Sequence, residues 1–245
     1  MKRKIGILLC LALLTLCAIA LADITLETDQ YFKDATFREQ VRINFDENYD
    51  KQLSDDEIAK ATFIVVSDMD ITSLKGIEYL VSLETLGCHG NKLTSVDLSA
   101  NKELKFLELW DNQLGTLDVT QNTKLTHLSC EGNQLKTLDL SKNTVLSELY
   151  CNGNQITTLD VSNCPSLCSA MENNERIVTT DDHHRFGNYF HIDKDVTVIG
   201  RNGKISKPEN GELPVVEGSI KWSDLHYSFA NTAKDGSSLE PVGSD

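Results

Sequence analysis

Apolar and polar positions recur at a fixed interval of 21 residues through the middle of the chain. One column holds Leu83, Leu104, Leu125, Leu146 and Leu167, and the next holds Leu86, Leu107, Leu128 and Leu149. A polar column follows with Asn91, Asn112, Asn133 and Asn154. Because a strict period of this length is the signature of stacked structural units, the pattern predicts a solenoid of similar turns.

Within each unit, apolar residues two positions apart predict a short strand. Leu107 and Leu109 both point inward from an extended chain, because side chains alternate between the two faces of a strand. Stacking the next unit covers the exposed edge and builds a parallel sheet. The asparagine marks the turn away from the sheet, where its amide can bond to backbone groups of its own turn and of its neighbour. The second apolar pair, as in Leu117-Asp118-Val119, is too short for a helix and predicts an extended return side.

Written out, Leu104-x-x-Leu107-x-Leu109-x-x-Asn112-x-Leu114 is the leucine-rich-repeat consensus. Over roughly residues 30 to 175 the chain resembles the secreted bacterial leucine-rich-repeat proteins, including the internalin-like group, which typically carry runs such as Thr157-Thr158-Leu159-Asp160-Val161-Ser162-Asn163. The resemblance implies an α/β, mostly β, fold. This would be a short right-handed curved solenoid with a parallel concave sheet, a small helical N-terminal cap and extra C-terminal strands. It also implies binding of a protein or glycan at a surface rather than catalysis.

The remaining chain divides around the repeat. Residues 1–22 have the pattern of a signal peptide, with Lys2, Arg3 and Lys4 before an apolar run and Ala20-Leu21-Ala22 at the cleavage positions. The expected parts after it are the cap at 23–62, the solenoid at 63–175, a strand extension at 176–206 and an irregular or partly disordered tail at 207–245. An uncleaved anchor is the alternative for the apolar run. Cleavage predicts a secreted protein without a membrane span. We expect this protein to be a monomer.

The segment after the repeat carries strand-like runs. These are Arg176-Ile177-Val178-Thr179 and Val196-Thr197-Val198-Ile199-Gly200. Asn202-Gly203 lies between Ile199 and Ile205 and is a hairpin signal. We expect these strands to continue or close the open end of the sheet.

The cap contains an EF-hand-like sequence. A helix expected over Thr36 to Phe45, with Phe37, Val41 and Phe45 on one face, precedes a loop whose oxygen-bearing residues have the spacing of a calcium loop. The predicted ligands are Asp46, Asn48, Asp50, the Gln52 carbonyl, Ser54 and Glu57. Lys51 departs from the pattern, because the sixth loop position is normally a glycine with positive φ. The sequence therefore predicts a structural calcium, and a metal-free cap, known in the internalin-like group, is the alternative.

The positions between the inward leucines predict a solvent-facing surface on the concave sheet. They are Thr85, Gly87, His89, Phe106, Glu108, Trp110, His127, Ser129, Glu131, Glu148, Tyr150 and Asn152. Aromatic residues beside carboxylates are common in protein and sugar contacts, although single exposed aromatics are ordinary. Three aromatics in one narrow sheet favour a ligand-binding surface, whose predicted residues are Phe106, Glu108, Trp110, His127, Glu131, Glu148 and Tyr150.

The net charge excludes two classes of partner, and the positions of the cysteines predict their state. Removal of the three cations in residues 1–22 changes the net charge from −14 to about −17, so nucleic acid and anionic lipid are repelled. Cys88, Cys130 and Cys151 share the inward column of Leu109 and should be buried, reduced thiols. Cys164 and Cys168 lie in the degenerating last repeat, and whether they pair is left open.

Two other functions remain as alternatives to a binding module. One is a metal-dependent hydrolase that uses Asp181, Asp182, His183, His184 and His191, although adjacent histidines face opposite ways in a strand. The other is a purely structural segment of a cell-surface assembly. The sequence has no nucleophile-elbow, zinc-helix or phosphate-loop motif. A secreted, non-enzymatic binding module is therefore the preferred interpretation.

Overall fold

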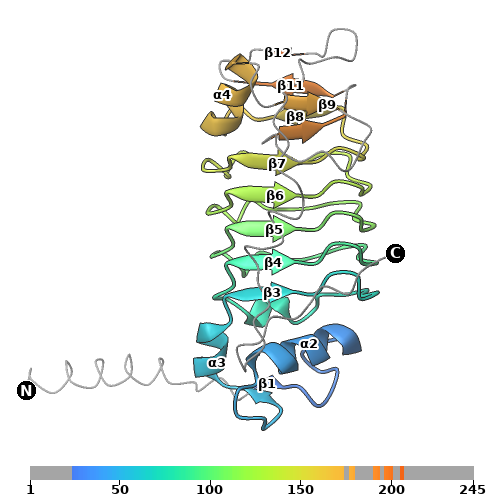
Figure 1. Ribbon diagram of the computed structural model, residues 1–245, viewed down its shortest axis with the longest axis vertical. Coiled ribbons are helices and arrows are strands. Elements are labelled where there is room, and N and C mark those ends of the chain that lie inside the picture. Colours follow the sequence, from blue (N-terminus) through green and yellow to red (C-terminus); the bar gives the residue numbers. More distant parts are fainter. Residues whose placement is uncertain (1–23, 174–176, 180–189, 194–195, 201–204, 207–245) are drawn as a thin grey trace, which may run out of the picture.

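Short parallel strands, one from each repeat, stack into a single column (Figure 1). The computed structural model describes residues 24–173, 177–179, 190–193, 196–200 and 205–206. The stack contains β3 (Phe63–Val65), β4 (Thr85–Gly87), β5 (Phe106–Glu108), β6 (His127–Ser129) and β7 (Glu148–Tyr150). Equivalent residues of successive repeats are paired, so that Leu107 lies between Leu86 and Leu128. The predicted parallel solenoid and its register are confirmed.

The inward columns form the hydrophobic core. Leu107 and Leu109 are fully buried, as are their counterparts in the neighbouring repeats. Cys88, Cys130 and Cys151 occupy the Leu109 column and are buried free cysteines, as predicted. Burial raises the pKa of the Cys88 thiol to about 12, which keeps it protonated at neutral pH. These cysteines therefore act as small apolar side chains.

The predicted asparagine column ties each repeat to the one before it. The Asn112 side-chain oxygen accepts from Leu93 N–H at 3.0 Å, and its amide nitrogen donates to the carbonyls of Cys88 and Leu109 at 2.9 and 3.1 Å. Asn133 repeats the pattern one turn later. Each amide thus satisfies buried backbone groups of two turns, which a leucine could not do.

A second asparagine column, which we did not predict, lies on the return side. Asn101, Asn122 and Asn143 are fully buried. The Asn122 amide donates to the carbonyls of Leu98 and Asn101 at 3.0 and 2.8 Å, and Asn143 donates in the same way one turn later. This column closes the turns opposite the sheet.

Cys164 takes the next place in that second column. Its Sγ lies 3.8 Å from the Leu140 carbonyl oxygen and 3.5 Å from that of Asn143. Cys168 Sγ lies 3.1 Å from the Val161 carbonyl oxygen. Both cysteines are buried and free, which answers the open question about their pairing. The thiol of Cys164 reaches the same carbonyl positions that the asparagine amides serve in the repeats before it.

The N-terminal cap has the predicted helix-loop-helix form. Strand β1 (Ile24–Thr25) pairs antiparallel with β2 (Gln52–Leu53), and helices α2 (Ala35–Phe45) and α3 (Asp55–Lys60) flank the loop. Helix α2 begins after Asp34, whose carboxylate accepts from the Thr36 and Phe37 amides. Its buried face is the predicted one of Phe37, Val41 and Phe45. A short 3-10 helix, η2 (Ile77–Tyr79), lies in the first repeat.

The sheet continues beyond the last repeat through strands from the following segment. Strand β10 (Phe190–Ile192) pairs with β7, and β9 (Ile177–Thr179) pairs with β10. A smaller sheet joins β8 (Thr158–Asp160) on the return side to β11 (Thr197–Ile199), which forms an antiparallel pair with β12 (Ile205–Ser206). The prediction that extra strands continue the open end is confirmed. The two strands flanking Asn202-Gly203 pair as expected, while that turn lies outside the described residues.

Helix α4 (Pro165–Asn173) departs from the repeat pattern. Along the sequence it covers the residues where the 21-residue period would put the next strand, while β10 takes the next place in the sheet, and we did not predict it. Pro165 suits a helix start, because its fixed φ and missing N–H cost nothing in a first helical turn. Leu167 remains fully buried, so the leucine column persists while the backbone changes from strand to helix.

No helix in the described part of the chain has the length and apolar character needed to cross a bilayer. The predicted signal peptide at 1–22 and the predicted tail at 207–245 lie outside the described residues. Their roles stay predictions.

Candidate ligand-binding face

The outward side chains of β4 to β7, together with those two residues past each strand, form one surface that we call the sheet face. It holds all seven predicted binding residues. Pairing between strands places Phe106 beside His127 and His127 beside Glu148. The next row continues from Glu108 through Ser129 to Tyr150. A third row, just past the strands, contains His89, Trp110 and Glu131.

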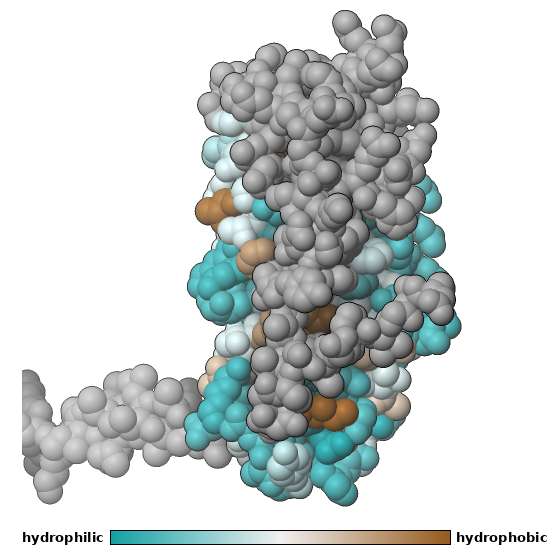
Figure 2. All heavy atoms as spheres, viewed as in Figure 1, coloured by the Kyte–Doolittle hydropathy of each residue, from teal (hydrophilic) through white to brown (hydrophobic). Residues whose placement is uncertain are grey.

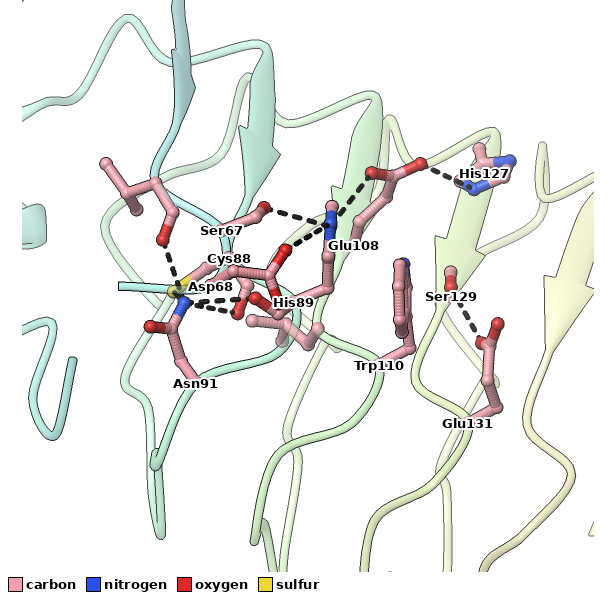
Figure 3. A network of polar contacts seen from close by, with 12 residues as sticks. Ser67, Asp68, Cys88, His89, Asn91, Glu108, Trp110, His127, Ser129 and Glu131 are labelled. Atoms are coloured by element: carbon pink, nitrogen blue, oxygen red, sulfur yellow. Dashed lines mark hydrogen bonds and ion pairs between the residues drawn. The ribbon is translucent and has the colours of Figure 1, made fainter. Parts of the chain in front are cut away.

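Rings from adjacent repeats stack along these rows. The His89 and Trp110 rings lie 4.0 Å apart and are tilted by 7° (Figure 3). Phe106 stacks on His127 at 5.6 Å, and Tyr150 lies 5.4 Å from the other side of His127. Because strands in a sheet are about 4.8 Å apart, rings at equivalent positions meet with little adjustment. The stacking fixes the orientation of the side chains before any ligand binds.

Glu108 lies between two histidines. Its carboxylate is 3.7 Å from His89 Nδ1 and 3.9 Å from His127 Nε2 (Figure 3). His127 Nδ1 forms a shorter contact with Glu148 Oε2 at 2.8 Å. A hydrogen bond of 2.9 Å also joins His89 Nδ1 to the Ser67 hydroxyl. Imidazole and carboxylate groups thus alternate across the strands, and no transition-metal arrangement of three such groups occurs among the described residues.

Glu131 is the carboxyl group most altered by the fold. Burial raises its pKa to about 7, the nearby Glu108 charge adds to the increase, and a hydrogen bond from the Ser129 hydroxyl at 2.7 Å opposes it. The carboxyl group is therefore about half protonated near neutral pH. A cation placed against it would favour the ionised form.

The face continues onto apolar residues of the preceding strand β3 that the sequence analysis missed. Phe63 and Val65 are 37% and 38% exposed, beside the predicted Phe106 at 41%. The alternation around the buried Ile64 could have shown that both neighbours face outward. The Val65 side chain covers Gly87, where an added Cβ would lie 3.0 Å from Val65 Cγ2. On the side seen in Figure 2, the visible hydrophobic residues form small separate groups between hydrophilic ones.

Four positions expected to face solvent are buried instead. Ser129 and Asn152 are only 4% and 3% exposed, and Gly87 and His89 are buried as well. For Gly87 the cause is the larger Val65 side chain beside it. Ser129 carries its hydrogen bond to Glu131. The expectation that all twelve positions are solvated was therefore wrong for these small and polar residues.

The cap loop contains two residues with left-handed backbone, Tyr49 and Lys51. Lys51 adopts φ of 64°, the left-handed value expected at the sixth position. The Asp46 carboxylate accepts from the Asp50 and Lys51 amides, both at 3.1 Å. Glu57 accepts from the Glu47 and Ser54 amides at 2.8 and 2.9 Å. The loop therefore closes on its own carboxylates.

These oxygens do not converge on a common cation position. No group of three His, Cys, Asp or Glu side chains in the described residues is arranged to hold a metal ion. The Asn48 oxygen accepts from Asp50 N–H at 3.0 Å, and one Asp50 oxygen accepts from Gln52 N–H at 2.8 Å. The Glu57 carboxylate, the last of the predicted ligands, is engaged by the Glu47 and Ser54 amides in this arrangement. The ligand roles of Asp46, Asn48, Asp50, Gln52, Ser54 and Glu57 remain a prediction.

Most of the residues proposed for a hydrolase fall outside the described part of the chain. Asp181, Asp182, His183 and His184 lie outside the described part of the chain. The His191 backbone is described in β10, where it pairs with Tyr150. Nothing in the described residues brings these groups together.

The stacked parallel turns, the leucine core and the asparagine columns define a leucine-rich-repeat solenoid of about four turns with short helices. No protein-family model matches the sequence, and no curated protein matches it. Among solved structures, the chain is similar to internalin proteins of Listeria monocytogenes.

Three of these structures give the extent of the likeness. The functional domain of InlJ, which includes a cysteine ladder, is 25% identical with a TM-score of 0.46, covering 74% of this chain and 48% of that chain. Internalin InlF is 17% identical with a TM-score of 0.49, covering 74% and 72%. Internalin C2 is 16% identical with a TM-score of 0.27, covering 58% and 92%. The chain spans about half the length of the InlJ chain that it matches.

Proposed function

We propose that the protein is a secreted, non-catalytic binding module that recognises a protein partner through the sheet face. The observation that carries this proposal is the exposed Phe106 ring within rows of stacked rings and carboxylates. Apolar contact area surrounded by oriented polar groups is what protein interfaces use. The hydrogen-bonded columns beneath hold the backbone fixed, so binding needs little ordering of the surface.

A glycan is the second ligand class for the same face. Aromatic residues hold sugars by presenting a ring face, whereas the mutual stacking of His89 and Trp110 at 4.0 Å covers one face of each ring. This mutual stacking favours a protein partner.

Secretion and the monomeric state are parts of the proposal that rest on sequence alone. The basic, apolar and small-residue segments of residues 1–22 support export. A calcium ion in the cap is a separate proposal, supported by the order of oxygen-bearing residues and by the left-handed Lys51. It concerns the stability of the cap and not recognition of the partner.

Capture of partners by face variants tests the proposal. The purified mature chain is immobilised and exposed to extracts of candidate cell surfaces, and captured proteins are compared between the native chain and the variant Phe106→Ser with Tyr150→Ala. Val145→Ser is the matched control, because Val145 is 50% exposed and lies outside the sheet face. We expect at least a tenfold loss of capture for the face variant and none for the control.

Folding is monitored by circular dichroism in each variant. Equal capture by the folded face variant and the native chain would contradict the sheet-face assignment. That outcome would favour a purely structural role. Turnover across a hydrolase panel that disappears with His183 and His184 replaced would instead support the enzyme alternative.

A further inference from the structure

The sheet face lacks permanent positive charge. Its twelve outward positions include three glutamates and two histidines, and none is lysine or arginine. Some carboxylates elsewhere in the solenoid pair with a lysine from the adjacent repeat, as Glu84 does with Lys105 at 2.7 Å and Asp70 with Lys92 at 2.9 Å. Lysine balances these charges away from the face.

The glutamates of the face have different partners. Within the described residues, Glu148 contacts the His127 imidazole at 2.8 Å and Glu131 contacts the Ser129 hydroxyl at 2.7 Å. A hydroxyl carries no charge, and an imidazole carries one only when protonated. Glu131 and Glu148 come from adjacent repeats, and the Phe106 ring stacks on His127, which contacts Glu148. The face therefore combines carboxylates in need of a counter-charge with an exposed apolar ring.

We propose that the partner presents a basic, arginine-bearing segment to the sheet face, with its guanidinium groups against Glu131 and Glu148 and its apolar parts against Phe106. This inference rests on the proposed function and names the chemistry of its partner. Arginine suits the face because a guanidinium group binds carboxylates with two parallel hydrogen bonds and also lies against aromatic rings. A bare metal cation suits it less, since no three ligating side chains in the described residues form a metal cluster.

Acidification should weaken this binding. The Glu131 carboxyl group, whose pKa burial raises to about 7, gives up its proton when a guanidinium group pairs with it. The other carboxylates, beside His89 and His127, are Asp68, Glu108 and Glu148. Their charges favour the basic segment at neutral pH.

A fluorescent nona-arginine peptide serves as the probe, with nona-glutamate as the negative control. Its dissociation constant for the mature chain is measured by anisotropy at pH 8 and pH 5.5, at near-physiological salt so that unspecific attraction is screened. The face variant is Glu131→Gln with Glu148→Gln. The matched control is Asp118→Asn with Asp139→Asn, which removes the same charge from the return side and keeps the acceptor oxygens for Thr120 and Ser141.

We expect the face variant to weaken nona-arginine binding at least tenfold at pH 8 and the return-side control to change it less than twofold. The native chain should bind at least tenfold more weakly at pH 5.5 than at pH 8, and Glu131→Gln should reduce that difference. Equal weakening by both double variants, or no binding of nona-arginine to the native chain, would overturn the inference. The native chain could fail to bind nona-arginine while the Phe106 and Tyr150 variant still loses its captured partner. That result would support recognition through the sheet face and contradict a basic partner.

Discussion

Gly132 lies directly against the carboxylate of Asp111 in the preceding repeat, so that a Cβ added at Gly132 would be 2.2 Å from Asp111 Oδ1. Both residues have positive φ, 62° for Gly132 and 49° for Asp111. The same arrangement joins Gly90 to Asp68, where the distance is 1.9 Å. Aspartate in one turn therefore requires glycine in the next.

Replacing Gly132 by Ala should destabilise the protein by about 2 kcal/mol or more, since left-handed backbone costs alanine about 1 kcal/mol and the carboxylate must also move. Urea unfolding followed by circular dichroism measures the change. Gly115→Ala is the control, because nothing lies within 4 Å of its added Cβ. Similar losses in both variants would show that the aspartate contact has no special role.

Replacing Asn122 by Ala should cost about 2–4 kcal/mol, because the carbonyls of Leu98 and Asn101 lose their donors inside the core. The neighbouring exposed Gln121→Ala should change the free energy of unfolding by less than about 0.5 kcal/mol. Thermal unfolding of both variants measures the difference. A loss below 1 kcal/mol for Asn122→Ala would mean that water replaces the amide without penalty.

Replacing Glu131 by Gln should stabilise the protein at pH 8 and leave it nearly unchanged at pH 4. Burial raises the Glu131 pKa from 4.5 to about 7, so between these values the folded state holds more protons than the unfolded chain. Stability from this group therefore falls as pH rises through that window. Each pKa unit corresponds to about 1.4 kcal/mol, and partial exposure reduces the total to on the order of 1–2 kcal/mol.

Melting temperatures of the native chain and Glu131→Gln from pH 4 to pH 8 measure this effect. The two curves should separate progressively above about pH 5. Parallel curves over the whole range would indicate that Glu131 ionises as it does in an unfolded chain.

Calcium at millimolar concentration should raise the melting temperature of the cap if Glu57 exchanges its backbone partners for the ion. Glu57→Gln is a poor test alone, because Glu57 also closes the capping box with Ser54 and its loss costs about 1 kcal/mol without any metal. Asp50→Asn is the better variant, since it lies in the exposed part of the loop and keeps an acceptor oxygen for Gln52 N–H. Calorimetry in calcium and in chelator should show a rise for the native chain and a smaller one for Asp50→Asn. Identical melting of the native chain in both conditions would end the calcium proposal.

Most of the solenoid could be predicted from the spacing alone. The 21-residue period indicated which leucines face inward. Because the repeats have the same length, it also predicted that their strands pair in register. The positions of Phe106, Trp110 and Tyr150 on one face followed from the same alternation. The extra strands β9, β11 and β12 were visible as short apolar runs with a turn signal.

Other features depend on contacts that spacing does not show. The period also includes Asn101, Asn122 and Asn143, but polar residues in a return segment usually face water, so their burial was not expected. Helix α4 replaces a strand because Pro165 permits a helix start while Leu167 still fills its place in the core. The alternation of His89, Glu108, His127 and Glu148 depends on side-chain rotamers between strands, which a one-dimensional pattern cannot supply.

The backward reach of the asparagine bonds has a consequence for how such a chain can change its length. The amides of Asn112 and Asn133 each donate to a carbonyl 24 residues earlier, and those of Asn122 and Asn143 to carbonyls 24 and 21 residues earlier. The first repeat is longer by one residue, and there the Asn91 amide donates to the Val66 carbonyl 25 residues earlier. If one complete turn is duplicated, each asparagine amide of the added turn finds an equivalent backbone carbonyl in the turn before it. The carbonyls of the added turn are in turn reached by the asparagine amides of the turn that follows. Growth or loss by whole turns is therefore the change in length that this architecture tolerates most readily.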